Sequence, residues 1–339
     1  MLQLDNRTPY AAERTIVMDK AGAKSWVVAV KATFDLGQNG VTALADAQLP
    51  VLYSPEHLGD AGTSSIRYEA DLIPSKRATD VLVNGHAHAP GGRPTSAVDV
   101  NLRVGHVNKR LRVFGDRYWG VGFPGRLRAS SPVRFERMPI IFERAFGGWD
   151  QTDPDPARQK LEPRNPIGSG FAIAERHLEG RPLPNVEHPT QLISSWSDRP
   201  APAGLGAIAS YWSPRLEWAG TYGDAWAKHK LPLLPDDFDD RFHQCALPDQ
   251  QVQGCLRGGE EIALDNLSEF GSLRFALPKI YLAFSTRFGK ERVEHRATLQ
   301  TVVIEPDARR LVMVWQTSLA CHHTLDLLDR TVVYEKSYV

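Results

Sequence analysis

The stretch WVVAVKATF, Trp26–Phe34, determines the class of fold that this chain can adopt. Apolar side chains occupy every second position from Trp26 to Phe34, and the polar residues Lys31 and Thr33 lie at positions between them. A repeat of two places alternate side chains on opposite faces of a β-strand, whereas an amphipathic helix needs a repeat of 3.6. The side chains expected on one face are Trp26, Val28, Val30, Ala32 and Phe34. The stretch therefore predicts a strand.

Other segments show the same pattern and form natural pairs. AVDVNLRVG (residues 97–105) and RLRVF (110–114) are separated by the polar link HVNK, which is typical of a β-hairpin. ATLQTVVIE (297–305) and RLVMVWQTS (310–318) flank the turn PDAR and predict a second hairpin, and DVLVNGHAHA and TVVYEKSYV predict further strands. Helix signals are few and short, and the best are DLLDR and DDFDDRF. We expect a mainly β fold of antiparallel sheets, arranged as a sandwich or a barrel, with few short helices.

The middle of the chain has a different composition. Nine prolines lie between residues 150 and 204, and proline removes a backbone donor and fixes φ, so regular sheet is not expected there. Six of the eight tryptophans lie between Trp119 and Trp226, which is too much apolar surface for a disordered linker. We expect long, irregular, Pro- and Trp-rich loops packed on one β-rich domain of residues 1–339. Any subdivision should fall near residues 150–205.

Charge and composition limit the classes of partner. The 339 residues include 40 Lys plus Arg and 40 Asp plus Glu, so the net charge is zero. This balance argues against nucleic acid or an anionic membrane as the main partner. No stretch approaches the roughly 18 apolar residues of a membrane span, and the N-terminal residues do not resemble a signal peptide. Three cysteines without metal-like spacing indicate free thiols in a reducing cytoplasm.

Three short motifs resemble chemical sites. His86 and His88 would share one face of a strand, as metal ligands must, but no third ligand lies at a familiar spacing. GVGFPG (residues 120–125) matches G-x-G-x-x-G, yet Pro124 interrupts it and no apolar helix follows, so we reject a dinucleotide site. Cys321 and His323 could share a strand face as a nucleophile and its base, but no other catalytic motif accompanies them. We expect no metal and no cofactor.

Carboxylates offer another chemistry, that of a sugar-active hydrolase with two acids roughly 5–9 Å apart. Asp116, Asp224 and Asp237 are the candidates, and the last two belong to the acid-rich stretch TYGDAWAKHKLPLLPDDFDDRF (residues 221–242). Aspartate-rich loops are common, however, and spacing along the sequence does not give the distance between two carboxylates. We therefore keep a carbohydrate-active hydrolase only as an alternative function.

The acidic run also has a complete local explanation. Aspartates favour the first turn of a helix, where they cap backbone N–H groups and interact with the helix dipole. Phe238 and Phe242 are four residues apart and would lie on one helical face against the core, and Arg241 could pair with Asp237. We expect a short helix here, with structural aspartates.

The stretch VFGDRYW (residues 113–119) allows two interpretations. Asp116 could cap a tight turn after Gly115 while Arg117 pairs with an acid. Alternatively, these charged residues and their aromatic neighbours could form a knuckle that contacts a partner protein.

Seven motifs, taken in order, resemble a bacterial family of unknown function, domain-of-unknown-function family 2169, encoded in type VI secretion loci. The resemblance extends from about Lys31 to Pro278. The motifs are RYEADLIPSKRATDVLVNGHAHAPGG, RVFGDRYW, FERMPIIFERAFGGWD, NPIGSGF, LPNVEHP, WAGTYGDAWAKHKLPLLPDDFDDRF and GGEEIALDNL.

The resemblance implies a non-enzymatic adaptor or chaperone. Such a protein would bind a toxic effector in the cytoplasm and load it onto the secretion spike, with VgrG or PAAR proteins as further partners. A structural component of the secretion apparatus is a second alternative to the adaptor. Because Trp, Tyr and Arg dominate the energetics of protein interfaces, we predict the effector contact at Arg117, Trp119, Trp149 and Trp226.

Overall fold

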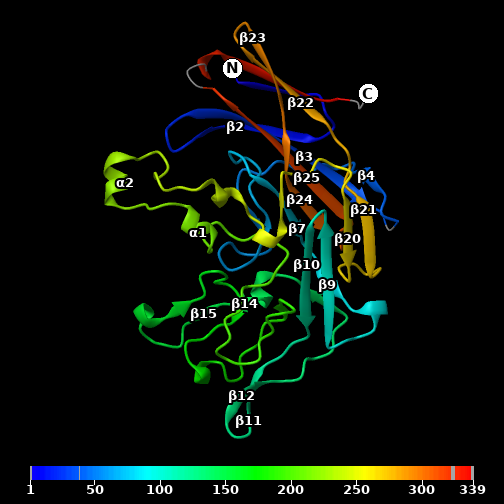
Figure 1. Cartoon of the computed structure of the whole chain (residues 1–339), viewed down its shortest axis with the longest axis vertical. Coiled ribbons are helices and arrows are strands. Elements are labelled where there is room, and N and C mark those ends of the chain that lie inside the picture. Colours follow the sequence, from blue (N-terminus) through cyan, green and yellow to red (C-terminus); the bar gives the residue numbers. More distant parts are fainter. Residues whose placement is uncertain (1, 38, 322–324, 337–339) are drawn as a thin grey trace.

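The computed structural model describes residues 2–37, 39–321 and 325–336 and is mainly β, as the alternating patterns predict (Figure 1). Its largest sheet has seven strands, and β3, which contains the stretch Trp26–Phe34, lies inside it between β25 and β2. All pairs in this sheet are antiparallel except β7 and β24, which are parallel. In spatial order the strands are β19 (Gln251–Gln253), β7 (Ala78–Val83), β24 (Thr298–Glu305), β25 (Arg310–Ala320), β3 (Lys24–Leu36) and β2 (Ala11–Met18), and β4 (Thr42–Leu44) also pairs with β3.

Both faces of this sheet are buried. One face contributes Val28, Val30 and Met313 to the main core, and the other contributes Leu82 and Val312 to a second core under irregular segments. Lys31 lies on the second face and is buried, with its Nζ atom 2.9 Å from Oδ2 of Asp71. The charge of Lys31 is tolerated inside the buried strand because the carboxylate of Asp71 pairs with it.

A five-stranded antiparallel sheet packs on the first face and completes a sandwich. Its order is β18 (Val186–Glu187), β10 (Val107–Phe114), β9 (Ala97–Val104), β20 (Glu261–Asp265) and β21 (Ser272–Ala276). Alternate residues of β9, including Val100 and Leu102, enter the main core. The predicted hairpin of β9 and β10 is confirmed, with a turn of only Gly105 and His106 because most of the expected polar link is part of β10.

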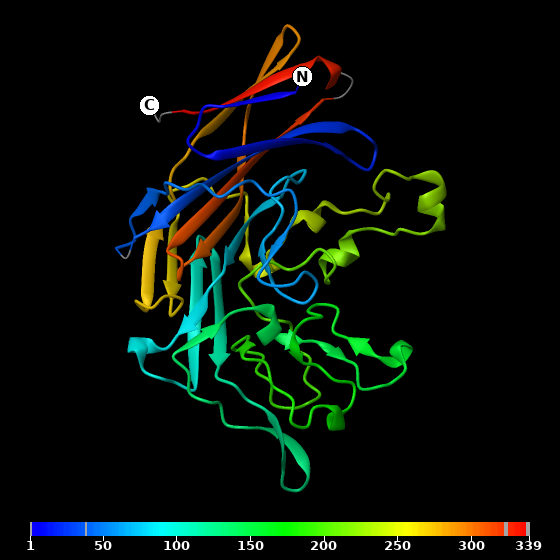
Figure 2. The same cartoon turned by 180° about the vertical axis from the view of Figure 1, so that it is seen from behind.

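A four-stranded sheet lies near both ends of the chain, at the top of Figure 1, and Figure 2 shows it from behind. Its order is β1 (Gln3–Asn6), β26 (Leu328–Glu335), β22 (Leu282–Phe288) and β23 (Glu291–Arg296). Phe284 and Val333 point from its inner face into the main core. The predicted C-terminal strand is confirmed as β26, but DLLDR forms no helix of its own: a 3-10 turn, Leu325–Leu327, leads directly into β26.

The central part of the chain, in green at the lower end of Figure 1, consists of short strand pairs joined by long loops. It has a separate small core of buried side chains, which confirms an ordered, irregular segment: Trp119, Phe146, Ala172, Leu178, Leu183 and Ile193. Its short strands are β11 (Trp119–Gly122), β12 (Arg126–Ala129), β13 (Arg137–Pro139), β14 (Phe146–Gly147), β15 (Trp149–Asp150), β16 (Lys160–Leu161) and β17 (Ser169–Gly170). Three short strands precede this part of the chain: β5 (Glu56–His57), β6 (Ile66–Tyr68) and β8 (His86–His88), which pairs with β13.

Helices are few and short. The α-helices among the described residues are α1 (Arg215–Trp218) and α2 (Asp224–His229), so neither approaches the length of a membrane span. The other 3-10 helices are η1 (Pro90–Gly92), η2 (Phe142–Arg144), η3 (Pro156–Arg158), η4 (Glu175–His177), η5 (Asp240–His243) and η6 (Pro248–Gln250).

Candidate partner-binding surface

Trp149 is held at the surface by a short strand. It lies in β15, opposite Leu161 of β16, and 52% of Trp149 and 43% of Leu161 are exposed. The next residue, Asp150, is buried and accepts hydrogen bonds from the backbone N–H of Ile173 at 2.9 Å and from Nδ1 of His177 at 2.8 Å. Because side chains alternate along a strand, anchoring Asp150 inward directs Trp149 outward.

The anchor at Asp150 is a charged one. Burial alone raises the pKa of this carboxyl group, but hydrogen bonds from Thr152, His177 and the backbone of Ile173 outweigh that effect and hold its pKa well below the usual range. A carboxylate that remains ionised keeps accepting these hydrogen bonds at neutral pH. These hydrogen bonds tie the strand that presents Trp149 to the segments that contain Ile173 and His177.

The hairpin of β11 and β12 forms a second exposed apolar element. It projects from the lower end of the molecule, as Figure 1 shows. Its root is anchored by Trp119, which lies opposite Ala129 and is buried in the small core. Leu127, opposite Val121 nearer the tip, packs on the same core and donates its backbone N–H to Glu175. At its tip, Phe123 is 91% exposed, and Val121 nearby is also exposed. The hairpin tip therefore presents two large apolar side chains to solvent, which makes it a candidate for contact with a partner.

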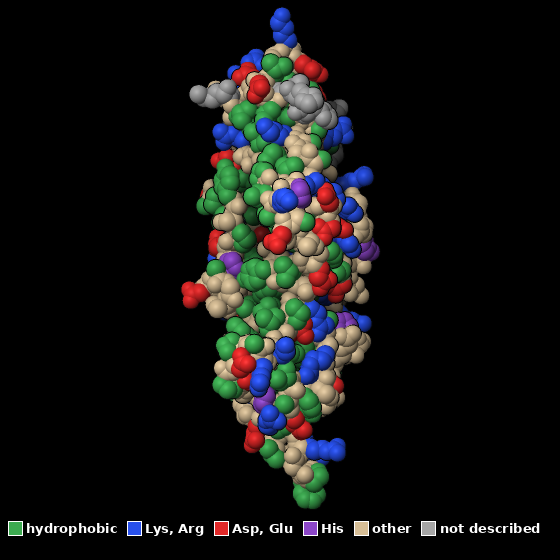
Figure 3. Space-filling model, turned by 90° about the vertical axis from the view of Figure 1, so that its left-hand side faces the viewer, with side chains coloured by type: hydrophobic (Ala, Val, Ile, Leu, Met, Phe, Trp, Pro, Cys, Tyr) green, Lys and Arg blue, Asp and Glu red, His purple; other side chains and the backbone are tan. Residues whose placement is uncertain are grey.

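These residues are part of a wider concentration of exposed apolar side chains. Among the residues that the structure describes, 19 large hydrophobic side chains are exposed, and twelve of them lie between residues 118 and 231, about a third of the chain. Figure 3 shows many hydrophobic side chains on the face that carries α2 and β15. We call these twelve residues, which are distributed over several elements from the β11–β12 hairpin to the segment around α2, the central apolar surface: Tyr118, Val121, Phe123, Val133, Trp149, Leu161, Ile173, Leu192, Tyr211, Leu216, Tyr222 and Leu231.

Arg117 and Trp119, two of the four predicted contact residues, are buried. Arg117 donates to the carbonyl of Pro184 at 2.6 Å, pairs with the buried carboxylate of Glu187, and stacks on Phe114 with 3.9 Å to the ring centroid. Trp119 is 2% exposed, in the small core. The prediction that Arg117 pairs with an acid is confirmed. Neither residue offers surface to a partner in this structure, and both instead support the root of the hairpin.

Trp226 lies between these extremes. It is half-buried in α2, donates from Nε1 to the carbonyl of Leu233 at 2.8 Å, and packs edge-to-face on Tyr222 with 4.8 Å between centroids. Its neighbours Tyr222 and Leu231 belong to the central apolar surface. Of the four predicted contact residues, Trp149 therefore belongs to the central apolar surface, and Trp226 lies next to it.

The acidic stretch 236–240 has the structural role that its pattern predicts, with a different pairing. Asp239 caps η5 and forms an ion pair of 2.8 Å with Arg241, whereas Asp237 accepts hydrogen bonds from Thr221. The predicted pair of Arg241 and Asp237 is wrong because the helix begins only at Asp240, so these residues are not four apart on one helix. Hydrogen bonds from the Arg241 side chain and backbone lower the pKa of Asp239 to about 2.

The aromatic pair next to this stretch fastens it to the core. Phe238 is buried and lies 5.5 Å from Phe242, centroid to centroid. Arg215 of α1 donates to the carbonyl of Phe242 at 2.9 Å and to Oε2 of Glu69 at 2.6 Å. The stretch is thus connected to residues far away in the sequence.

His86 and His88 share a strand face, as predicted, and bind one carboxylate. Asp307 accepts from Nδ1 of His86 at 2.8 Å and from Nε2 of His88 at 2.7 Å, and Arg137 lies 3.2 Å away. Burial raises the pKa of Asp307, but these hydrogen bonds outweigh it and lower the value to about 2. Within the described ranges, no group of three or more His, Cys, Asp or Glu residues is arranged to hold a metal ion.

The remaining chemical candidates are distributed through the fold. GVGFPG is the hairpin tip and is followed by a strand, so it cannot cradle a phosphate as a loop before a helix does. Burial raises the pKa of the Cys321 thiol, which disfavours a thiolate, and His323 lies outside the described residues. Asp116 pairs with Arg144 at 3.0 Å instead of capping its own turn. Asp116 and Asp237 therefore have separate local partners.

Sequence reasoning missed Phe123, Leu161 and Ile173 as surface residues. For Phe123 a signal exists, because an aromatic residue between Gly122 and Pro124 at a turn cannot easily reach a core. Leu161 and Ile173 offer no such signal, since their exposure depends on how the irregular loops pack. Burial of Trp119 and exposure of Trp149 likewise follow from tertiary packing.

Comparison with known proteins identifies a family without a described activity. The model of a family described as "Uncharacterized protein conserved in bacteria (DUF2169)" matches residues 21–316. Neither a search of curated proteins nor a search of solved structures returned a match.

Proposed function

Because the chain belongs to the bacterial family DUF2169, whose model spans residues 21–316, we propose that it is an adaptor or chaperone for a type VI secretion effector. It binds the toxic effector in the cytoplasm and helps to load it onto the VgrG or PAAR proteins of the spike. The secretion role comes from the resemblance of the sequence motifs to this family. We propose no enzymatic activity.

The observation that carries the binding role is the central apolar surface. Most large apolar side chains of a folded monomer are buried, so exposed ones that concentrate in one part of the chain are candidates for binding a partner. Trp149 and Phe123 suit this role because aromatic side chains supply much contact area and lose little conformational entropy. The hydrogen bonds of Asp150 also favour binding, since side chains held in place by such contacts have less entropy to lose on association.

The test is to delete the gene in the native bacterium and compare the secreted proteins by quantitative mass spectrometry. The adaptor proposal predicts loss of one or a few toxins, while the spike and tube proteins are still secreted. The same toxin should co-purify with the tagged chain from the cytoplasm. Unchanged secretion of every toxin would overturn the proposal, and the chain's own appearance in secreted material would favour a structural component of the apparatus.

Matched variants connect the phenotype to the surface. The double variant Trp149→Ala with Phe123→Ser removes two exposed aromatic side chains from the central apolar surface. Phe270→Ala removes an exposed aromatic residue from outside it, since Phe270 is 45% exposed in the loop between β20 and β21. The double variant should lose the toxin and the control should retain it. Equal loss in both would show that the partner does not bind where we propose.

A further inference from the structure

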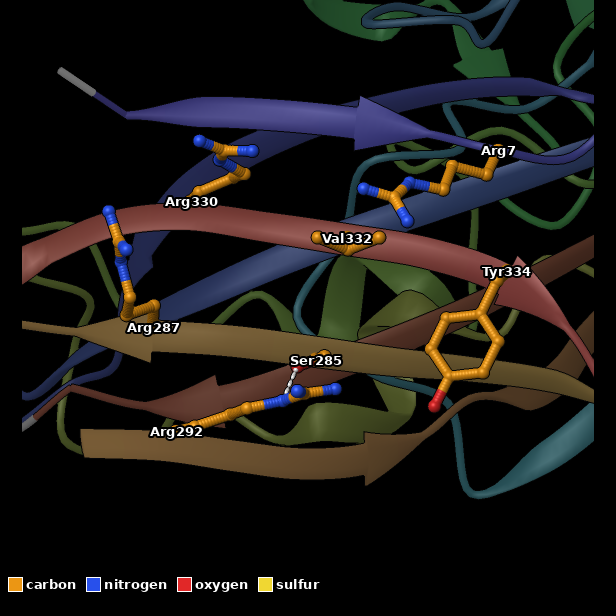
Figure 4. A pocket seen from close by; sticks show the side chains of 7 residues that line it. All are labelled: Arg7, Ser285, Arg287, Arg292, Arg330, Val332 and Tyr334. Atoms are coloured by element: carbon orange, nitrogen blue, oxygen red, sulfur yellow. Dashed lines mark hydrogen bonds between the residues drawn. The ribbon is translucent and has the colours of Figure 1, made fainter. Parts of the chain in front are cut away.

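The outer face of the four-stranded sheet carries a row of arginines. In the register of the strands, Arg287 of β22 is directly opposite Arg292 of β23 on one side and Arg330 of β26 on the other. Arg7, which follows β1, reaches the same face, and Figure 4 shows the four side chains around one depression. We call these four residues the arginine surface. Their side chains are between 43% and 67% exposed.

Such a row is unfavourable for the isolated protein. Like charges directly opposite each other on neighbouring strands destabilise a sheet. Three nearby carboxylates reduce this cost: Asp329 pairs with Arg287, Glu294 with Arg292 at 2.8 Å, and Asp5 with Arg7 at 2.8 Å. Arg330 is left with only a distant contact of 3.9 Å to the same Asp5. Four guanidinium groups thus share three carboxylates, in a chain whose overall charge is zero.

The arginines surround a depression with a partly apolar floor. The cavity has a volume of about 500 Å³ and is also lined by Ser285, Val332 and Tyr334. Each guanidinium presents five N–H donors in a planar fork that matches a carboxylate or a phosphate, and one carboxylate partner leaves donors unused. The site therefore offers several charged donors around an apolar floor.

We propose that the arginine surface binds an acidic, extended polypeptide segment. Neighbouring strands are about 4.8 Å apart, so the row of three arginines spans about 10 Å. In an extended peptide, side chains on the same side repeat about every 6.7 Å, so two carboxylates with one residue between them match this span within the reach of an arginine. Val332 and Tyr334 can contact the aliphatic parts of such a segment.

Other anions fit the surface less well. A single phosphate group would contact one or two arginines and leave most of the cavity empty. A nucleic-acid backbone would place its closely spaced phosphates against Asp5 and Glu294, which lie beside the arginines, and the neutral chain provides no wider positive field to attract it. The inference goes beyond the adaptor function and does not depend on it, because it concerns a different surface and a defined ligand chemistry.

The experiment measures fluorescence anisotropy of a short labelled peptide of alternating glutamate and threonine with the full-length chain. We expect saturable binding that weakens with added salt, and no binding of the matching peptide of glutamine and threonine. Arg287→Gln combined with Arg330→Gln should weaken binding at least about tenfold. The control, Arg126→Gln combined with Arg128→Gln, removes two exposed arginines from the hairpin and should leave binding unchanged.

Competing probes and stability complete the test. Tighter binding of tripolyphosphate or of a single-stranded oligonucleotide would overturn the proposal, as would equal loss in the two double variants. Thermal melting shows whether the variants fold. Arg330→Gln alone should not lower the melting temperature, since it removes a like-charge contact and only a distant attraction, yet it should still weaken the peptide complex. A failure of this binding would leave the secretion phenotype of the adaptor proposal intact, so the two are separately testable.

Discussion

Replacing Lys76 by methionine tests how the second core tolerates charge. Lys76 is buried just before β7, with Nζ 2.6 Å from Oδ2 of Asp80 and 2.9 Å from Oγ1 of Thr301. Asp80, fully buried in β7, also accepts from Nε2 of Gln244 and from the backbone N–H of Cys245, each at 2.8 Å. The pair therefore joins the central sheet to the segment that follows the acidic stretch.

The size of the effect follows from this burial. Burial alone lowers the pKa of Lys76, but the neighbouring Asp80 and Cys245 outweigh it and raise its pKa, so the ammonium stays charged. Methionine has a similar shape and no charge, and it would leave the Asp80 carboxylate buried without a cation. Removing one partner of a buried ion pair costs about 3–5 kcal/mol. That is a large fraction of a typical unfolding free energy of about 5–15 kcal/mol.

Urea unfolding followed by tryptophan fluorescence measures the loss. The double variant, Lys76→Met with Asp80→Asn, removes the stranded charge and should be about 2 kcal/mol more stable than Lys76→Met alone. Lys228→Met, at an exposed position, is the control and should change stability by less than about 0.5 kcal/mol. If Lys76→Met cost less than about 1 kcal/mol, or if the double variant were no more stable, the reasoning would be refuted. If the single variant fails to fold, recovery of folded protein in the double variant decides the question.

Three further predictions follow from the same structure. Trp119→Ala should lower the unfolding free energy by about 3–5 kcal/mol and Trp149→Ala by less than about 1 kcal/mol, as measured by urea unfolding, because only Trp119 is in a core. Gly115→Ala should cost about 1–3 kcal/mol, since its Cβ would overlap the carbonyl oxygen of Val133, whereas Gly120→Ala meets nothing and should cost less than about 1 kcal/mol. Burial lowers the pKa of His243 and His295 from 6.5 to about 4, so unfolding titrations should show stability that is constant above pH 6.5 and falls between pH 6.5 and 4, where only the unfolded chain takes up these protons. At about 1.4 kcal/mol per pH unit the fall is at most about 3.5 kcal/mol for each histidine. Partial exposure reduces it to about 1–2 kcal/mol, and His295→Gln should flatten the slope.

The strands and hairpins of this fold could be predicted from local sequence. In β9 the alternation of apolar residues reports directly which side chains face the core, because a strand has a period of two. β3 and β25 are buried on both faces and are nearly continuous apolar runs, which also indicate strands. The role of the acidic stretch was predictable for a similar reason, since capping by Asp239 involves only its own neighbours in sequence. The residue at which that helix begins, and hence the partner of Arg241, could not be predicted from the sequence.

The candidate binding surface depended on contacts between distant segments. Trp119 and Trp149 both lie in short strands of the central part of the chain, yet one fills the small core and the other is exposed. The packing of the irregular loops decides which side of each strand is covered. The arginine surface has the same origin. Its members lie near opposite ends of the sequence, and no motif marks them: Arg7, Arg287, Arg292 and Arg330. They meet because β1 pairs with β26, which brings the two ends of the chain together beside β22 and β23. The sequence by itself determined the β class, the hairpins and the local caps, since these depend on near neighbours. Only the tertiary structure decided which aromatic and charged side chains are free to bind a partner, because exposure is a property of the whole packing.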